Sequence, residues 1–315
     1  MAKHRIKKYS RRTTSAAQRS KAGLAVFLVI AFVILSVIIS VAVGIALGKR
    51  TDKLPVDKNY DLDMPDYESN GKKVSGVEAY HFPTGANPAD YVYQDIYDLS
   101  VAVRHKDGSL SYHLNAGEKF PIDEMGERSF ETLCDNARDA GARVCAYFYV
   151  TSFDVEDEHE REIIKAYEIA LIAEIAESGA DDILLLGLSV TENNVSEIEK
   201  FVSDAAKAAE NAPVGVAIDR ETVLLTEKEI YLAGRMRAAC DYLALDLTDL
   251  KVSDGESLGK DPEGNPLESR LSEILGDFRY YIKTYSMRLI FAQAEYKLYE
   301  PALKLGAENI QIVGE

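Results

Sequence analysis

The chain has 315 residues, 47% of them apolar and 28% charged, with 20 Gly, 9 Pro and 3 Cys, which excludes collagen, a long disordered chain and a disulfide-dense miniprotein. Its net charge of −16 combines ten Lys and Arg and no acid in residues 1–50 (+10) with 26 basic and 52 acidic residues in 51–315 (−26). A body this acidic repels phosphate backbones, so we expect no nucleic-acid partner.

The first apolar segment, residues 22–48, is 27 residues long and contains no charged side chain. About 20 apolar residues suffice to cross a bilayer as a helix, whereas a cleaved signal peptide has an apolar core of roughly 7–15. We therefore predict a transmembrane signal-anchor in contact with the lipid bilayer; a cleaved signal peptide is the alternative. Residues 1–21 form a basic tail that should remain cytoplasmic, which places the rest of a single-pass protein outside the cell membrane.

Residues 49–73 are polar and contain Pro55 and Pro65, so we predict a linker that holds a body at 74–315 away from the bilayer. In that body, short apolar and β-branched runs alternate with longer amphipathic segments, the pattern of parallel strands joined by helices. The candidate strands are 74–80, 98–103, 143–150, 182–190, 213–219, 241–247, 288–294 and 309–313. The helical patterns are 89–98, 130–142, 159–180, 195–212, 226–240, 267–286 and 299–307.

Eight strand–helix units predict a closed (β/α)8 TIM barrel, a fold for which about 250 residues is the usual size. An open dinucleotide-binding sheet is disfavoured because only one glycine occurs in the stretch after the first strand, residues 77–88. The sequence stops just after the eighth strand, so we expect the eighth helix to be missing. The linker, a protein partner or a second copy of the chain would then cover that side of the barrel.

Active sites of TIM barrels lie at the carboxyl ends of the strands. Side chains alternate between two faces along a strand, and the small residues of 213–219 and 241–247 should face the barrel axis. This alternation turns Asp219 and Asp246 into the mouth, and Glu295 follows the seventh strand. Because paired carboxylates supply the acid and the nucleophile or base of glycoside hydrolysis, we predict these three as catalytic residues. The alternative for each is a helix cap or a solvated loop residue.

The same alternation suggests further inward-facing side chains, for which we predict a role in substrate binding: Glu78, Arg104, Tyr147, Tyr149 and Gln293. Tyrosine rings can stack on sugars, although a tyrosine in a barrel strand is most often part of the core. The sequence contains no CxxC and no cluster of His and Cys, so we expect no metal site and no cofactor. The three cysteines are expected to be small buried hydrophobes: Cys134, Cys145 and Cys240.

One passage resembles a known family. Residues 167–183, YEIALIAEIAESGADDI, resemble the helix-to-strand-four passage of the bacterial putative glycoside hydrolase barrels, which are distantly related to α-amylase-type barrels. Residues 98–114 and 74–80 are similar to the second and first strands of that family. The resemblance covers 74–315 in the order of its elements and implies a glycosidase-like barrel that is secreted or anchored in a membrane.

The departures from this family concern its functional positions. The family's strand-four Asp aligns with Leu186 and the Tyr that follows it aligns with Gly187, so this carboxylate is lost. Residues 189–191 replace an Arg-Phe-Pro tract, and residues 104–107 alter the acidic turn after strand two. The resemblance therefore implies the fold more firmly than the activity. We expect a membrane-anchored extracellular barrel that acts on or binds carbohydrate; the alternative is a catalytically inactive carbohydrate-binding or envelope scaffold module.

Overall fold

The computed structural model describes most of the body of the chain. The described residues are 67–69, 71–119, 124–219, 227–250, 271–276, 278, 282, 287–293, 298–305, 307 and 309–314. The chain divides into two compact units, residues 1–57 and 58–315, and the first unit, with the predicted span at 22–48, lies outside the described residues. Within the described part, no helix is both long and apolar enough to cross a bilayer.

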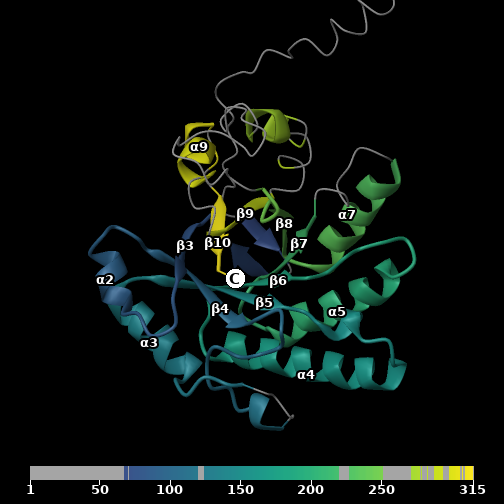
Figure 1. Ribbon diagram of the computed structural model, residues 1–315, viewed down its shortest axis with the longest axis horizontal. Helices are drawn as coiled ribbons and strands as arrows, with labels where there is room; N and C mark the ends of the chain where they lie inside the picture. Colours follow the sequence, from purple (N-terminus) through teal and green to yellow (C-terminus); the bar gives the residue numbers. More distant parts are fainter. Residues whose placement is uncertain are drawn as a thin grey trace, which may run out of the picture. The chain divides into compact units, whose positions relative to one another are not determined.

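Eight parallel strands close into a barrel, which confirms the predicted TIM-barrel architecture (Figure 1). The strands follow one another around the barrel in sequence order, and the last pairs with the first to close it. They are β3 (Glu78–Phe82), β4 (Asp98–Arg104), β5 (Arg143–Tyr149), β6 (Asp182–Leu186), β7 (Val214–Ile218), β8 (Tyr242–Asp246), β9 (Arg288–Ala292) and β10 (Ile310–Val313). Each coincides with or overlaps a run that the sequence identifies.

Helices surround the barrel and cover its outer face (Figure 1). They include α2 (Pro88–Val92), α3 (Phe130–Ala140), α4 (Glu158–Glu177), α5 (Val195–Ala208), α7 (Glu227–Ala239) and α9 (Tyr299–Lys304), with short 3-10 turns η1 (Gly117–Lys119) and η2 (Ser152–Asp154). Local sequence sets their ends. The Ser129 hydroxyl accepts a hydrogen bond from the Thr132 amide at the start of α3, and Gly141 ends that helix with φ +84°, a left-handed conformation that favours glycine.

A hairpin precedes the barrel, within the stretch expected to be linker. Strands β1 (Tyr67–Ser69) and β2 (Lys72–Val74) pair antiparallel. The Lys72 ammonium donates to two backbone carbonyls at and after the end of α5, at 2.6 and 3.1 Å, and lies 3.4 Å from the Asp241 carboxylate. Val74 is buried against inward-facing barrel residues. The folded body therefore starts earlier than predicted, because this short polar hairpin covers the amino end of the barrel.

Alternation along the strands separates two packing layers. On β4, Leu99, Val101 and Val103 pack outward beneath the helices, whereas Ala102 faces the barrel interior. The apolar interior consists of Ala102, Tyr147, Leu184, Leu186, Ala217, Tyr242, Ala244, Ile290 and Val313. The small residues of β7 and β8 thus face the axis, as their spacing predicts.

Polar residues at the strand starts complete the amino end of the barrel. Each accepts a hydrogen bond from a backbone amide of another part of the barrel: Glu78 N to Asp98 (3.0 Å), Val144 N to Asp181 (2.7 Å), Val214 N to Asp241 (2.9 Å) and Val77 N to Asn309 (3.2 Å). These amides lie at or just before a strand start, where the ladder supplies fewer partners. The side chains therefore satisfy donors that would otherwise be unpaired.

Gly215 provides a direct test of the interior packing. It lies opposite Tyr242 in the β7–β8 register, and a Cβ added to it would overlap the Tyr242 ring. We predict that Gly215→Ala lowers the free energy of unfolding by about 1–3 kcal/mol through overpacking, as measured by urea unfolding. Tyr242→Leu removes the ring, so the two changes together should cost less than the sum of the single changes. Simple additivity would contradict this packing.

Candidate functional site

The two predicted catalytic aspartates occupy corresponding positions at the carboxyl ends of adjacent strands. Ile218 of β7 pairs with Leu245 of β8, so the next residue on each strand is Asp219 and Asp246. Both are partly buried. Neighbouring strands are about 4.8 Å apart, a spacing compatible with the carboxyl separation of about 5–10 Å that glycoside hydrolysis requires. The barrel thus brings these two carboxylates to one side of its mouth.

Asp246 is held by its own loop. Its Oδ1 accepts hydrogen bonds from the Thr248 amide at 2.8 Å and from the Thr248 hydroxyl at 2.6 Å, an arrangement typical of an aspartate that stabilises a turn. The other two predicted site residues in this region are Gln293 and Glu295. Gln293 follows β9 and is exposed, while Glu295 lies outside the described residues.

Tyr147 and Tyr149 of β5 face the barrel interior. Tyr147 is fully buried, and its hydroxyl accepts a hydrogen bond from the Gly314 amide at 2.8 Å. Burial raises the pKa of Tyr147, so this side chain stays neutral and acts as a hydrogen-bonding group of the interior. Tyr149 is only partly buried, which places it at the more accessible end of the strand.

Arg104 does not point into the barrel as expected. Between Ala102 and Arg104 the β4–β5 register shifts by one residue, so Arg104 pairs with Phe148, an outward-facing residue. A bulge of this kind reverses the alternation of the residues beyond it. The Arg104 guanidinium instead binds the buried Glu168 of α4 at 2.5 Å and the Thr151 hydroxyl at 2.8 Å. It is a structural link between strand and helix.

Glu78 also differs from expectation. It is the first residue of β3, at the opposite end of the barrel from the mouth, and its carboxylate accepts a hydrogen bond from the Tyr299 hydroxyl of α9 at 2.9 Å. Tyr80, two residues along the same strand, packs against the Tyr299 ring with centroids 4.9 Å apart. Glu78 and Tyr80 therefore share the outer face of β3, and Glu78 is not a candidate for substrate binding in the mouth.

His81 follows the first predicted strand, and the sequence favours a loop residue over a general base for it. It lies near the carboxyl end of β3, and a Cβ added to Gly314 would come within 2.7 Å of its Nδ1. Nδ1 is buried, and no described group forms a hydrogen bond to it. Burial, with the nearby charge of His105, lowers the pKa of His81 below its ordinary value of 6.5.

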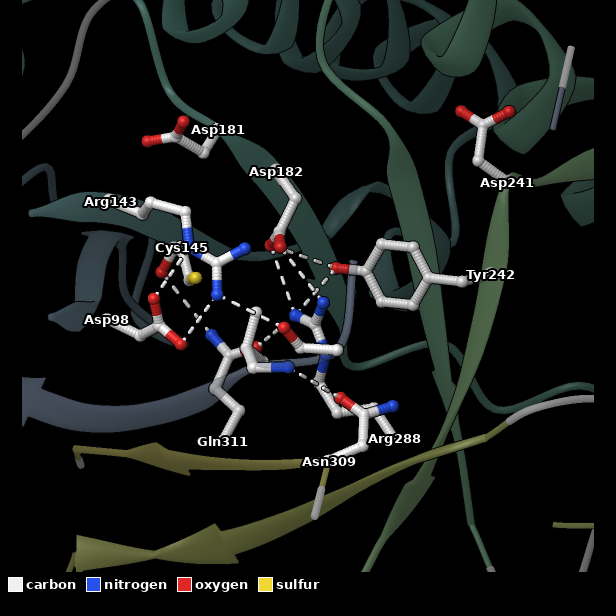
Figure 2. A network of polar contacts seen from close by, with 12 residues as sticks. Asp98, Arg143, Cys145, Asp181, Asp182, Asp241, Tyr242, Arg288, Asn309 and Gln311 are labelled. Carbon is white, nitrogen blue, oxygen red and sulfur yellow. Dashed lines mark hydrogen bonds and ion pairs between the residues drawn. The ribbon is translucent and has the colours of Figure 1, made fainter. Parts of the chain in front are cut away.

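A buried polar network fills the amino half of the barrel interior (Figure 2). The Arg288 guanidinium of β9 binds Asp182 of β6 through both carboxylate oxygens, at 2.9 and 3.1 Å. It also donates to the Tyr242 hydroxyl at 3.1 Å and to the Gln311 side chain at 2.8 Å. Gln311 donates in turn to the Ser100 hydroxyl at 3.1 Å. Side chains of five strands thereby form one connected set.

Electrostatics keep this network charged. Arg288 is completely buried, and burial alone would lower the pKa of its guanidinium. The negative charge of Asp182 outweighs that effect and raises the Arg288 pKa, so the guanidinium stays charged. Burial raises the pKa of the Tyr242 phenol well above its usual range, which keeps it a neutral hydrogen-bonding partner. In such barrels the amino end serves stability, and we assign this network a structural role.

A cavity of about 270 Å³ opens beside this network at the amino end. Its walls include Lys73, Arg143, Cys145, Asp181 and Asp182. Arg143 is paired with Asp98 at 2.7 and 2.8 Å, and Asp181 accepts the Val144 amide, so these charges already have partners within the protein. Among the described residues, no group of three or more His, Cys, Asp or Glu side chains is placed to hold a metal ion.

The sequence matches no known protein family and no curated protein. Solved structures with similar folds include a GH113 β-1,4-mannanase, at 10% identity and a TM-score of 0.50 over 76% of this chain and 88% of that one. A putative α-L-fucosidase from Bacteroides thetaiotaomicron has 9% sequence identity and a TM-score of 0.49, over 76% of this chain and 85% of that one. An aldolase has 12% sequence identity and a TM-score of 0.43, over 74% of this chain and 87% of that one. At 10% identity, the likeness to the mannanase shows a shared fold alone.

The buried network predicts a large loss of stability when one partner is removed. Arg288→Met leaves the Asp182 charge buried without its counterion, which should lower the free energy of unfolding by about 3–5 kcal/mol. Arg143→Met is the matched control, because the Arg143 side chain is 39% exposed and water can partly replace its contacts. Chemical denaturation measures both. Equal losses in the two variants would contradict the central role of Arg288.

His81 predicts a specific dependence on pH. Its folded pKa is lowered, so between that value and 6.5 the unfolded chain binds a proton that the folded chain does not. The free energy of unfolding should therefore fall as the pH falls through this window. In an NMR titration, the His81 ring should titrate below 6.5, and His105→Gln should raise its pKa by removing the neighbouring charge. Titration at or above 6.5 would contradict the described burial.

Proposed function

We propose that this chain is a single-pass membrane protein whose external barrel acts on carbohydrate at the carboxyl ends of its strands. The membrane assignment is supported by the 27 uncharged residues at 22–48 and by the +10 charge of residues 1–50. The shared fold with a β-1,4-mannanase supports carbohydrate as the substrate class. We place the catalytic work at the mouth because TIM barrels carry their active sites there.

The observation that carries this proposal is the register of β7 and β8. It sets Asp219 and Asp246 at corresponding positions on adjacent strands, where one carboxyl group donates a proton to the leaving oxygen and the other acts as nucleophile or base. Glu295 is the third candidate. Leu186 faces the interior at the end of β6, at the position that the resemblance aligns with the family's carboxylate, and the proposal places the acids on the next two strands instead. Tyr149 supplies a ring near the mouth for sugar stacking.

A second function is favoured by one contact. Both hydrogen bonds that Thr248 donates to Asp246 hold this carboxylate in a turn, which is the arrangement expected if Asp246 only stabilises its loop. In that case the barrel is a catalytically inactive module that binds carbohydrate or organises envelope proteins. The two functions differ in whether any glycosidic bond is cleaved.

Release of reducing ends by the full-length protein from a panel of envelope and plant glycans separates these functions. We predict release by the wild type and a fall of about 10²–10⁴-fold in Asp219→Asn and in Asp246→Asn, because each change removes an acid–base group. Asp154→Asn is the control, since Asp154 is an exposed aspartate just beyond the carboxyl end of β5. It should retain the wild-type rate.

No release from any glycan by the folded protein would refute the hydrolase and favour the binding module. Release that survives both substitutions would also refute the assigned pair, because the reaction would then use other carboxylates. Folding of each variant is checked by its thermal unfolding transition, so that loss of activity is not confused with loss of structure.

A further inference from the structure

A second cavity, of about 310 Å³, lies outside the barrel wall. It is enclosed by the loop after β3, by α2 and by one side of α3. Phe82, which lines it, faces outward from β3 and packs against Tyr91 of α2 with ring centroids 5.0 Å apart. The cavity is therefore separate from the interior of the mouth, where His81 and the inward-facing residues lie.

The two sides of this cavity differ in chemistry. Phe82 and Leu133 provide apolar walls, and Thr132 and Asn136 place a hydroxyl and an amide on the same side of α3. Residues 132 and 133 both neighbour residue 136 on the helix surface, because they precede it by four and three positions. A small ligand with an apolar face and several hydroxyl groups, such as a sugar ring, matches these walls.

Arg128 provides the charge of the cavity. Its side chain is exposed, and no described residue forms an ion pair or a hydrogen bond with it, although the body carries a large excess of acids. Its guanidinium lies against Gly85, where an added Cβ would be 3.1 Å from Nη1. Gly85 has φ +93°, so the loop passes close to the guanidinium in a conformation that favours glycine. A guanidinium fork is suited to carboxylate and phosphate groups.

The Tyr112 hydroxyl is an independent sign of a ligand. Tyr112 is 2% exposed and lines the cavity. The Thr84 side chain approaches its hydroxyl, but no described group forms a well-aligned hydrogen bond to this oxygen. Burial raises the pKa of Tyr112 to about 12, and Thr84 and Arg128 offset this only in part. Buried hydroxyl groups in folded proteins nearly always have a partner, so a group that enters the cavity would supply the missing one.

We propose that this cavity binds a small sugar that carries a carboxylate or a phosphate. The anionic group binds Arg128, a hydroxyl group of the sugar pairs with Tyr112, and the apolar face of the ring lies against Phe82 and Leu133. That the body of the ligand is a sugar rests on the proposed function, whereas the anionic group follows from Arg128 itself. The cavity would thus be an accessory site for acidic or phosphorylated glycans.

Isothermal titration calorimetry with the full-length protein in mild detergent tests this site. The probes are D-glucuronate, D-glucose 6-phosphate, D-glucose and inorganic phosphate. We expect the two charged sugars to bind at least about tenfold more tightly than glucose or phosphate, and the comparison between them identifies the anion. Arg128→Gln should weaken their binding about tenfold or more, and Tyr112→Phe should weaken it severalfold, because each change removes a donor to the ligand.

Arg138→Gln is the matched control, because Arg138 is an exposed arginine of α3 that is paired with Asp135 and does not line the cavity. It should bind as the wild type does. Binding of charged sugars that is unchanged in Arg128→Gln, or equal to that of glucose, would overturn the anion site. Equal binding of phosphate and glucose 6-phosphate would overturn the recognition of a sugar. Binding is measured without turnover, so failure of glycan release at the mouth leaves this test intact.

Discussion

A guanidinium in the centre of a protein has lost its water and is stable only where other groups replace that water. Asp182, Tyr242 and Gln311 do so for Arg288, and the four side chains come from four strands of the barrel. Their positions fix how β6, β8, β9 and β10 meet at the amino end. Leu184, Ala217 and Ala244 pack in the same buried cluster as Tyr242, which is part of the network.

Because the strands are parallel, the acidic residues at their amino ends and those at their carboxyl ends lie at opposite ends of the barrel. At the amino end, Asp98, Asp181 and Asp241 accept backbone amides, so their charges are used within the fold. At the carboxyl end, Asp246 accepts hydrogen bonds from Thr248 of its own loop. The contacts at the amino end support a structural role for that end of the barrel.

The sequence predicts the secondary structure well because the apolar periodicity is strong and strands such as β6 and β7 are buried on both faces. The inward direction of Asp219 and Asp246 follows from the small residues beside them. Arg104 faces outward and not into the barrel, because a bulge that no local sequence pattern reveals shifts its register. The network was missed because Asp182 and Arg288 are 106 positions apart and become neighbours only when the barrel closes. The polar hairpin at 67–74 has no apolar periodicity.

Hydrogen exchange of the full-length protein with and without a mixture of envelope and plant oligosaccharides tests most directly whether carbohydrate binds at the mouth. We predict slower exchange in residues 216–219 and 244–250, at the carboxyl ends of β7 and β8, with no change in the hairpin strands at 67–69 and 72–74. Slower exchange in the hairpin without any at the mouth would contradict this prediction, because the ligand would then bind at the end of the barrel assigned to stability.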